Sequence, residues 1–551
     1  MTDRLTIALA QINPIVGDID ANVALIQDAR VQAQELGCDL VLTGELVVSG
    51  YPPEDLVLKS SFLDTIHDAV SGLAKLTADG GPGLLVSAPW VEDGHLYNAA
   101  LVLDGGKIKA VVPKYALPNY GVFDEKRLFT PGGKPGAVNF RGIKLGIMTC
   151  EDMWVPEVSG ALMRDGAEAL LVLNGSPFEM DKPHTRLDLA RARVRETGLA
   201  LVYVNLVGGQ DELVFDGASF VLDATGEVRV HLPSFQAQVT AANFVWENDT
   251  LTPEYGAVTY PLEDDEAIYK ALVLGLRDYV NKNYFPGVMI GMSGGIDSAL
   301  SAAIATDALG AERVHCVMMP SPYTSQDSLE DASEAAKLLG CKLDTISIEP
   351  AMAAFDGMLK EQFVQHGADT TEENIQARSR GLVLMAMSNK FGYMVLSTGN
   401  KSEMSVGYAT LYGDMCGGYN VLKDVYKTRV YSLCKWRNSH YCDSLLGPDG
   451  QVVPERILTK APSAELKPDQ TDQDTLPPYA DLDDMLYCLI EKEESVADIA
   501  ARGYELEIVE KVWRMLDRAE YKRRQAPPGV KISSRAFGRD RRYPLTNGFS
   551  S

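Results

Sequence analysis

The sequence lacks the features of a disulfide-stabilised, zinc-binding or membrane-spanning protein. Its eight cysteines are scattered along 551 residues with no CxxC spacing, so neither a disulfide framework nor a zinc site is indicated. No apolar run approaches the roughly 18 residues of a membrane span, and no N-terminal stretch resembles a signal peptide. We therefore expect a cytoplasmic protein without a membrane partner.

Positive charge is also scarce. The chain has 51 Lys and Arg against 76 Asp and Glu, which gives a formal net charge of −25. Nucleic-acid-binding surfaces neutralise phosphates with Lys and Arg, so this balance argues against a DNA or RNA partner. The hydrophobic fraction of 46% and charged fraction of 23% are ordinary for a globular protein. Any anionic ligand must then be held by a local site.

Length and patterning indicate two α/β domains, residues 1–260 and 261–551. A chain of this length exceeds what one hydrophobic core serves. The first domain has many short β-rich runs and fewer helical segments, which predicts layered sheets covered by helices. Residues 246–266 lack periodicity and are rich in turn formers and acidic residues, so we interpret them as the linker.

The second domain has the pattern of a doubly wound parallel sheet. Apolar residues recur every four positions from Ile268 to Val280, as on the buried stripe of a helix. Strand-like runs then alternate with helical segments, which is typical of a parallel α/β sheet. Only the stretch 522–542 departs from this pattern, because it is basic and turn-rich.

A glycine- and serine-rich stretch, GMSGGIDSAL at 291–300, joins a predicted strand to a predicted helix. In such a turn, backbone N–H groups and the helix dipole can face an anion, and glycines permit close approach. A turn without a ligand is the alternative. Asp297 would repel a phosphate unless a divalent cation lies between them. The patterns GxxxxGK[ST] and GxGxxG are absent, which argues against kinase-type and dinucleotide-binding loops.

The form SGGxDS at 293–298 resembles the pyrophosphate loop of the N-type ATP pyrophosphatases, which include NAD, GMP and asparagine synthetases. The loop alone does not choose among them. Four later stretches resemble NAD synthetases in their order and spacing: ENIQARSRG (373–381), LSTGNKSEMSVGYATLYGD (396–414), KDVYKT (423–428) and EYKRRQAPPGVKI (520–532).

This resemblance implies two substrate sites and a metal site in the second domain. The ATP-binding residues would be Gly291, Ser293, Gly294, Gly295, Asp297, Ser298, Thr398 and Lys427. Asn374, Arg378, Glu403 and Lys522 would bind deamido-NAD, with Lys522 supplied by the same or a neighbouring subunit. Asp297 and Glu403 would hold Mg²⁺. Such a reaction needs positioning and charge neutralisation, and no protein nucleophile, when a carboxylate attacks the α-phosphate of ATP.

An adenylated carboxylate must then be attacked by ammonia, which many enzymes of this kind release from glutamine with an amidase. Because the sequence begins Met1-Thr2, we do not expect an amidase with an N-terminal nucleophilic cysteine. Cys150 lies in IMTCEDMW, outside a GxCxG elbow, after a strand-like run where a loop at the sheet edge would expose it. We interpret the other seven cysteines as small core or incidental residues.

Three stretches resemble the Glu-Lys-Cys set of the nitrilase superfamily: LTGELVVSGYPPEDL, VPKYALPNYGVFDEKRLF and IMTCEDMW. The resemblance implies that Glu45 is the general base and that Cys150 attacks the glutamine carboxamide. Lys114 would stabilise the oxyanion and help to lower the thiol pKa. The implied glutamine contacts are Tyr120, Glu125, Ser176 and Lys182, with Glu125 as a second carboxylate near the lysine.

Over nearly its whole length the chain resembles the bacterial glutamine-dependent NAD synthetases. This implies an α/β protein in which an αββα nitrilase-like sandwich is fused to a doubly wound parallel sheet of the adenine nucleotide alpha hydrolase-like type. The implied reaction converts deamido-NAD, ATP, glutamine and water to NAD, AMP, diphosphate and glutamate. A homo-oligomer with an enclosed path for ammonia is also implied.

Two alternatives stay open at this point. The same two modules could amidate another adenylated carboxylate. Otherwise the nitrilase-like half could be an inert oligomerisation or regulatory module attached to a synthetase that uses free ammonia. The presence of Glu45, Lys114 and Cys150 speaks against the second alternative.

Overall fold

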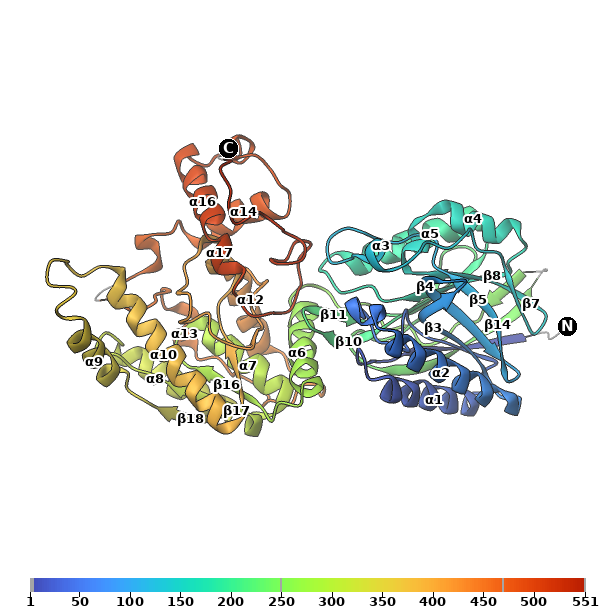
Figure 1. The fold of residues 1–551 in the computed structure, drawn as a ribbon, viewed down its shortest axis with the longest axis horizontal. Coiled ribbons are helices and arrows are strands. Elements are labelled where there is room, and N and C mark those ends of the chain that lie inside the picture. Colours follow the sequence, from blue (N-terminus) through green and yellow to red (C-terminus); the bar gives the residue numbers. More distant parts are fainter. Residues whose placement is uncertain (1–3, 248–249, 468–469, 550–551) are drawn as a thin grey trace. The chain divides into compact units, whose positions relative to one another are not determined.

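The computed structural model describes residues 4–247, 250–467 and 470–549. The chain divides into two compact units, Met1–Leu262 and Glu263–Ser551 (Figure 1). Among the described residues, no helix combines the length and apolarity that crossing a membrane requires.

The first unit is built mainly from strands. Its strands are β1 (Arg4–Gln11), β2 (Leu40–Leu42), β3 (Gly83–Glu92), β4 (His95–Asp104), β5 (Lys107–Pro113), β6 (Val138–Phe140), β7 (Ile143–Thr149), β8 (Ala169–Asn174), β9 (Ala200–Asn205), β10 (Val207–Gln210), β11 (Leu213–Asp216), β12 (Phe220–Leu222), β13 (Val228–His231), β14 (Gln238–Glu247) and β15 (Thr250–Pro253). Its helices are α1 (Ile19–Glu35), α2 (Ser60–Leu76), α3 (Glu125–Leu128), α4 (Pro156–Arg164) and α5 (Lys182–Thr197), with short 3₁₀ turns η1 (Glu54–Leu58), η2 (Thr77–Asp79) and η3 (Cys150–Trp154).

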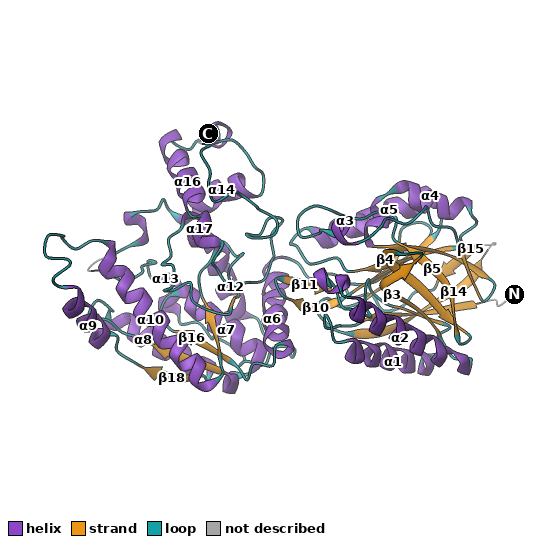
Figure 2. Ribbon diagram, in the orientation of Figure 1, coloured by secondary structure: helices purple, strands orange, loops and turns teal. Residues whose placement is uncertain are grey.

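These elements form the predicted αββα sandwich. One sheet has the order β15-β14-β1-β2-β3-β4-β5, the other β13-β12-β9-β8-β7-β6, and β10 and β11 form a separate pair. Helices α1 and α2 cover the first sheet, and α4 and α5 cover the second (Figures 1 and 2). Strands such as β8, ALLVLN, are apolar and buried along their whole length because both faces of the sheet are covered.

The interpretation of residues 246–266 as a linker is wrong for its first part. Strand β14 continues to Glu247, and β15 pairs antiparallel with it at the edge of the sheet. The short run Thr250–Pro253 alternates half-buried and buried side chains, and Leu251 enters the core between the two sheets. A four-residue edge strand is too short for its period-two pattern to be distinguished from a turn-rich segment.

The second unit contains one parallel sheet and many helices. Its strands are β16 (Val288–Gly291), β17 (Val314–Met318), β18 (Lys342–Thr345), β19 (Met394–Ser397) and β20 (Tyr419–Asn420). Its helices are α6 (Asp264–Lys282), α7 (Ile296–Leu309), α8 (Gln326–Leu339), α9 (Glu349–Leu359), α10 (Thr370–Phe391), α11 (Lys401–Val406), α12 (Lys427–Ser439), α13 (Glu455–Thr459), α14 (Tyr479–Ile490), α15 (Val496–Ala500), α16 (Leu506–Arg518) and α17 (Glu520–Arg523), with 3₁₀ turns η4 (Ala311–Arg313) and η5 (Asp472–Asp474).

The sheet is doubly wound, as predicted. Its order is β18-β17-β16-β19-β20, and all neighbouring strands are parallel. The strand order reverses at β16 and β19, so their carboxyl ends border the crevice where ligands of such sheets bind. Helix α6 carries the apolar stripe that the four-residue spacing predicted, with Ile268, Leu272, Leu276 and Val280 buried.

Candidate functional site

Three predicted catalytic side chains in the first unit follow the carboxyl ends of strands. Glu45 comes after β2, Lys114 after β5, and Cys150 directly after β7. All three side chains are buried. The fold therefore brings together an acid, a base and a thiol that lie more than thirty residues apart in the sequence.

Lys114 lies between two carboxylates. Its Nζ donates to Glu45 Oε1 over 2.7 Å and to Glu125 Oε1 over 2.9 Å. Burial lowers the pKa of Lys114, but the charges of Glu125 and Glu45 outweigh this effect and raise it above its usual value. The lysine is therefore a buried cation held between two carboxylates.

Glu45 is oriented by two further donors. Asn98 Nδ2 donates to Oε1 over 2.8 Å, and the Gly175 amide donates to Oε2 over 3.1 Å. Glu125 receives a 3.2 Å hydrogen bond from Tyr51 as well as that from Lys114. Burial raises the pKa of Glu125 to about 7, with Lys114 opposing and Glu45 reinforcing the shift. Burial and the charge of Glu45 thus favour the protonated form of Glu125.

Cys150 occupies a strained turn. Its φ of 47° lies in the left-handed region, which costs a residue with a Cβ roughly 1–2 kcal/mol. The expectation that a loop exposes this thiol is wrong, because Cys150 is only 4% exposed. The turn directs the residue inward, where Glu45, Lys114 and Glu125 act on it electrostatically. Backbone outliers of this kind cluster at active sites, and Cys150 is the predicted nucleophile.

The pKa of the Cys150 thiol is raised overall, although Lys114 acts on it as predicted. Lys114 does lower it, as predicted, but burial first and Glu45 second raise the pKa of Cys150 well above its usual value. The thiol is therefore protonated at neutral pH before substrate binds. Attack on a carbonyl then needs a neighbouring base to take the proton.

Of the four predicted glutamine contacts, one belongs to this cluster and three have other partners. Glu125 belongs to it directly. Tyr120 is 54% exposed, and its hydroxyl donates to Glu151 Oε2 over 2.9 Å. Lys182 Nζ lies 5.7 Å from the ring centroid of Phe123, which packs edge-to-face against Tyr120. Ser176 is buried, and its hydroxyl accepts a 3.1 Å hydrogen bond from Arg186.

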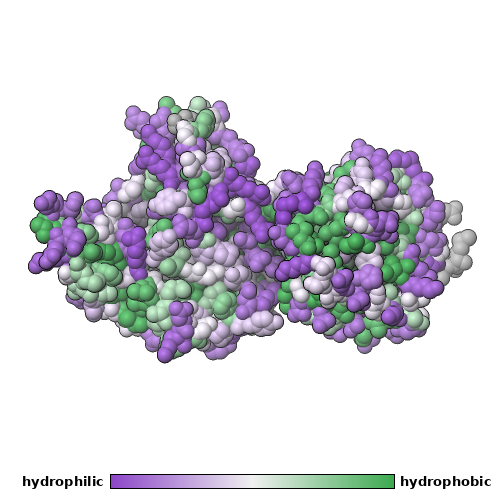
Figure 3. Space-filling model, viewed as in Figure 1, coloured by the Kyte–Doolittle hydropathy of each residue, from purple (hydrophilic) through white to green (hydrophobic). Residues whose placement is uncertain are grey.

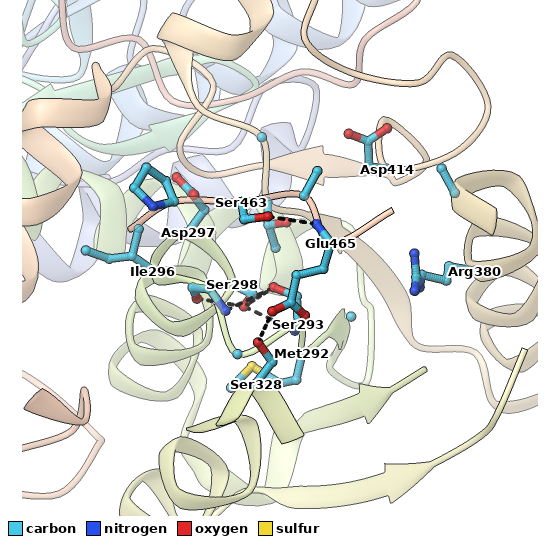
Figure 4. A pocket seen from close by; sticks show the side chains of 18 of the residues that line it. Met292, Ser293, Ile296, Asp297, Ser298, Ser328, Arg380, Asp414, Ser463 and Glu465 are labelled. Carbon is cyan, nitrogen blue, oxygen red and sulfur yellow. Dashed lines mark hydrogen bonds between the residues drawn. The ribbon is translucent and has the colours of Figure 1, made fainter. Parts of the chain in front are cut away.

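The second unit contains a large cavity at the carboxyl ends of its parallel strands. Figure 4 shows part of the cavity wall, with Asp297 and Ser298 on one side and Arg380 and Asp414 on another. Every residue predicted to bind ATP lines this cavity: Gly291, Ser293, Gly294, Gly295, Asp297, Ser298, Thr398 and Lys427. The turn at 291–295 leads into α7, so the helix N-terminus faces the cavity.

The shape of this turn depends on glycine and on two serines. Gly294 has a φ of +79°, and a Cβ there would lie 2.3 Å from the carbonyl oxygen of Ser328. The hydroxyls of Ser293 and Ser298 lie 3.0 Å apart, and Ser298 also donates to the Gly295 carbonyl. These contacts hold the turn in shape without a ligand.

Lys427 joins the two predicted metal ligands. Its Nζ donates to Asp297 Oδ2 and, over 3.0 Å, to Glu403 Oε1. Asn400 donates to Asp297 Oδ1 over 2.8 Å and also accepts from the Glu403 amide. Burial raises the pKa of Glu403 to about 7, against the effect of Lys427.

This donor set fits Mg²⁺. Magnesium is usually bound by one or two carboxylates, with substrate phosphates and water as its other ligands. Within the described ranges no group of three or more His, Cys, Asp or Glu could hold a metal. Asp297 and Glu403 lie beside the turn at 291–295, where ATP phosphates are predicted to bind. Two carboxylates next to phosphates are the ligands that Mg²⁺ prefers.

The predicted deamido-NAD residues Asn374, Arg378 and Lys522 do not line this cavity. They converge instead on the segment 407–411. Asn374 accepts from the Thr410 hydroxyl over 3.0 Å, and Arg378 donates to the Leu411 carbonyl over 3.2 Å. Lys522 donates to the Gly407 and Ala409 carbonyls over 2.8 and 2.6 Å. Thr410 itself lines the cavity, as does Glu403, the fourth predicted residue.

Asn98 and Arg380 are among the residues that sequence reasoning did not identify. Asn98 lies within β4 and has no motif to mark it, so only the fold shows that it contacts Glu45. Arg380 lines the cavity and donates through Nε to the Met319 carbonyl. It lies two residues after Arg378 on α10, and this i, i+2 spacing turns the two arginines to different sides of the helix. The stretch 373–381 could be identified from the sequence, but which of its two arginines lines the cavity could not.

Comparison with known proteins supports both halves of the chain. The carbon-nitrogen hydrolase family model matches residues 6–247, and the NAD synthase model matches residues 268–526. A glutamine-dependent NAD(+) synthetase from Rhodobacter capsulatus is 48% identical over 99% of both chains. One from Acinetobacter baylyi is 46% identical over 98% of both.

Solved structures agree. A glutamine-dependent NAD+ synthetase from Acinetobacter baumannii in complex with adenosine diphosphate is 44% identical, covers both chains fully and superposes with a TM-score of 0.79. A glutamine-dependent NAD(+) synthetase from Cytophaga hutchinsonii is 20% identical, covers 100% of this chain and 98% of its own, and shares the fold with a TM-score of 0.83. The chain therefore belongs to the glutamine-dependent NAD(+) synthetases, a family of ligases.

Proposed function

We propose that this chain forms NAD from deamido-NAD, ATP and glutamine, with residues 1–260 as the glutaminase and residues 261–551 as the synthetase. The observation that carries the proposal is the buried cluster of Glu45, Lys114 and Cys150 in a chain that also carries a phosphate-type cavity. The relatives are glutamine-dependent NAD synthetases, and this reaction uses both the cluster and the cavity.

The glutaminase step begins with proton transfer. The buried Cys150 thiol gives its proton to Glu45 as its sulfur forms a bond to the glutamine carboxamide carbon. Lys114, fixed between Glu45 and Glu125, stabilises the developing oxyanion. The carbon–nitrogen bond then breaks, Glu45 gives the proton to the leaving NH₂ group, which departs as ammonia, and a thioester forms.

The thioester is then hydrolysed. Glu45 takes a proton from a water molecule, whose oxygen attacks the thioester carbon, and the carbon–sulfur bond breaks to release glutamate. The proton returns to the Cys150 sulfur. We propose that Tyr120, Ser176 and Lys182 bind the amino acid end of glutamine. Tyr120 donates to Glu151, the residue after Cys150, Ser176 follows Gly175, whose amide donates to Glu45, and Lys182 begins α5 beside Phe123.

The synthetase step depends on charge neutralisation. Backbone amides of the 291–295 turn and Lys427 would bind the ATP phosphates. Asp297 and Glu403 would hold Mg²⁺, which supplies positive charge to the phosphates. The nicotinate carboxylate displaces diphosphate at the α-phosphorus, and ammonia then displaces AMP to form the amide.

Deamido-NAD binding is assigned to Asn374, Arg378, Glu403 and Lys522. Three of them brace the segment 407–411, which contributes Thr410 to the cavity wall. Asp414 and Arg378 also act electrostatically on Lys522: the first raises its pKa and the second lowers it. These contacts favour a dinucleotide that lies along the 407–414 segment.

Two further properties belong to the proposal. We propose a homo-oligomer, because α10 exposes Leu382, Met385 and Phe391, and hydrophobic patches interrupt the hydrophilic surface of this unit (Figure 3). Light scattering of the purified protein tests this, since a monomeric mass would contradict it. We also propose a cytoplasmic location, which cell fractionation tests.

The test of the function is NAD formation from deamido-NAD and ATP–Mg²⁺, with glutamine and ammonium as separate nitrogen donors. Formation with both donors is the expected result. Hydrolysis of glutamine without NAD formation from either donor would support another carboxylate as acceptor. Synthesis from ammonium with no glutamine hydrolysis would support an inert nitrilase-like half.

A further inference from the structure

Asp152 connects the two chain segments that carry the lysine and the cysteine of the glutaminase cluster. Its carboxylate is buried, with the residue only 2% exposed. Oδ1 accepts hydrogen bonds from the amides of Tyr115 and Ala116, over 3.0 and 2.7 Å. Oδ2 accepts from the amide of Thr149 over 3.1 Å. One carboxylate thus holds the peptides that follow Lys114 and the peptide that precedes Cys150.

A second link between these segments is weaker. Tyr120 donates to Glu151 Oε2 over 2.9 Å, but this bond joins two long side chains, one of them 54% exposed. Such a surface bond competes with water and is worth little. The Asp152 bonds are made to backbone amides in the interior, so movement of either segment leaves buried donors unpaired.

The charge of Asp152 is maintained by these same donors. Burial raises the pKa of Asp152 to about 6, and the amides of Ala116 and Thr149 oppose the shift, together with the charge of Lys114. The carboxylate is therefore ionised at neutral pH, and both its oxygens accept hydrogen bonds.

We propose that Asp152 is a positioning residue of the glutamine hydrolysis reaction, which sets the separation of Lys114 from Cys150. The inference rests on the proposed function of those two residues. Asp152 contacts neither the substrate nor the reacting atoms in this role. It acts through the backbone on both sides, so its removal displaces the oxyanion-stabilising ammonium relative to the attacking sulfur.

The substitution Asp152→Asn tests this with little change in volume. An asparagine side chain has one acceptor oxygen, and its NH₂ group would face an N–H donor. Either the Thr149 amide or the Tyr115 and Ala116 amides would then lose their acceptor. A displacement of about 1 Å between reacting groups lowers a rate on the order of 100-fold.

Asp223→Asn is the matched control. Asp223 is also 2% exposed, and its Oδ1 accepts from the amides of Thr225 and Glu227 over 2.8 and 3.0 Å. Its other partner is Arg229 in β13, which forms an ion pair with Oδ2, and none of these partners is a proposed catalytic residue. Both variants remove one buried carboxylate charge in the same unit, and Asp223→Asn also weakens an ion pair with Arg229, but only Asp152→Asn affects the cluster.

The experiment measures kcat and KM for glutamine hydrolysis in the full chain, together with NAD formation from ammonium. Rates are divided by the number of sites that a diazoketone glutamine analogue labels at Cys150, so that unfolded protein is not counted. Asp152→Asn is expected to lower kcat between about 10- and 100-fold relative to Asp223→Asn. The KM for glutamine and the ammonium-dependent rate stay unchanged.

Three outcomes would overturn the inference: equal kcat in the two variants, a raised KM with unchanged kcat, or a parallel loss of ammonium-dependent synthesis. If Asp152→Asn does not fold, Asp152→Glu is measured with the same outcomes, since it keeps the charge and displaces it by one methylene. Cys150→Ala separates this inference from the proposed function. Continued glutamine hydrolysis in Cys150→Ala contradicts the function itself, whereas its loss beside a normal Asp152→Asn contradicts only the positioning role.

Discussion

Lys114 donates a 2.7 Å hydrogen bond to Glu45 although both side chains are fully buried. A buried ion pair of this kind is weak evidence for stability, because desolvation of both charges costs about as much as their attraction returns. Its presence between β2 and β5 therefore points to a chemical role. Removing one partner of this ion pair lowers stability, because the other charge then remains buried without a partner.

Lys114→Met is expected to destabilise the first unit and to abolish glutamine hydrolysis. The carboxylates of Glu45 and Glu125 would lose their common cation, and breaking a buried pair in this way costs roughly 3–5 kcal/mol. Urea unfolding followed by circular dichroism measures the change. Lys144→Met is the control, because Lys144 is exposed and its Nζ donates to the Asp165 carbonyl rather than to a buried carboxylate. Equal effects of the two substitutions on the free energy of unfolding would contradict the buried pair.

The reactivity of Cys150 is expected to rise steeply with pH in the substrate-free protein. Burial and Glu45 raise the pKa of this thiol well above its usual value, so the thiolate is the minor form at neutral pH. Below its pKa, the thiolate fraction of a thiol increases about tenfold per pH unit. The rate of Cys150 alkylation by iodoacetamide, followed by mass spectrometry from pH 6 to 9, should therefore rise without a plateau. A plateau near pH 7 would show a lowered pKa and contradict this.

Lys522→Ala is expected to weaken deamido-NAD binding without affecting glutamine hydrolysis. The ammonium group braces the Gly407 and Ala409 carbonyls, and loss of one charged hydrogen-bond partner costs about 1.5–3 kcal/mol, or roughly tenfold or more in KM. Steady-state kinetics with ammonium as the nitrogen donor measures the KM for deamido-NAD. Lys511→Ala serves as the control, since Lys511 also donates to a carbonyl, that of Thr475, but outside this segment. An equal rise of this KM in both variants would contradict the proposal that Lys522 binds deamido-NAD.

Asp297→Asn is expected to abolish NAD formation from both nitrogen donors while glutamine hydrolysis continues. The substitution removes a proposed metal ligand and one of the two carboxylates that bind Lys427. Loss of preorganised charge at a phosphoryl-transfer site lowers rates on the order of 100-fold or more. Asp449→Asn, an exposed change in the same unit, is the control. Titration with Mn²⁺ and ATP checks the cause, because unchanged Mn²⁺ binding in Asp297→Asn would contradict its role as a ligand.

Much of this arrangement could be predicted from local patterns. Glu45, Lys114 and Cys150 each follow a strand-like run, and strands of one sandwich end close together, so their convergence was foreseeable. The turn at 291–295 carries its own signal in its glycines and serines. These predictions depend on residues that are near one another in the sequence or at the ends of elements.

The remaining features depend on tertiary contacts that leave no local pattern. Asn98 lies in the middle of β4, and only the register of that strand brings its amide to Glu45. The inward direction of Cys150 depends on one left-handed φ, which no propensity predicts for cysteine. The double ion pair of Lys427 joins residues that lie 130 and 24 positions away. The burial and electrostatic environment of these residues could be known only once the three-dimensional structure was available.

The most direct measurement compares NAD formation by the unchanged chain and by Cys150→Ala, each with glutamine and with ammonium as the nitrogen donor. If ammonia is released at Cys150 and used at the phosphate-type cavity, Cys150→Ala loses glutamine-dependent synthesis and keeps synthesis from ammonium. Equal loss with both donors, in a variant that still binds ATP and deamido-NAD, would contradict the two-site assignment.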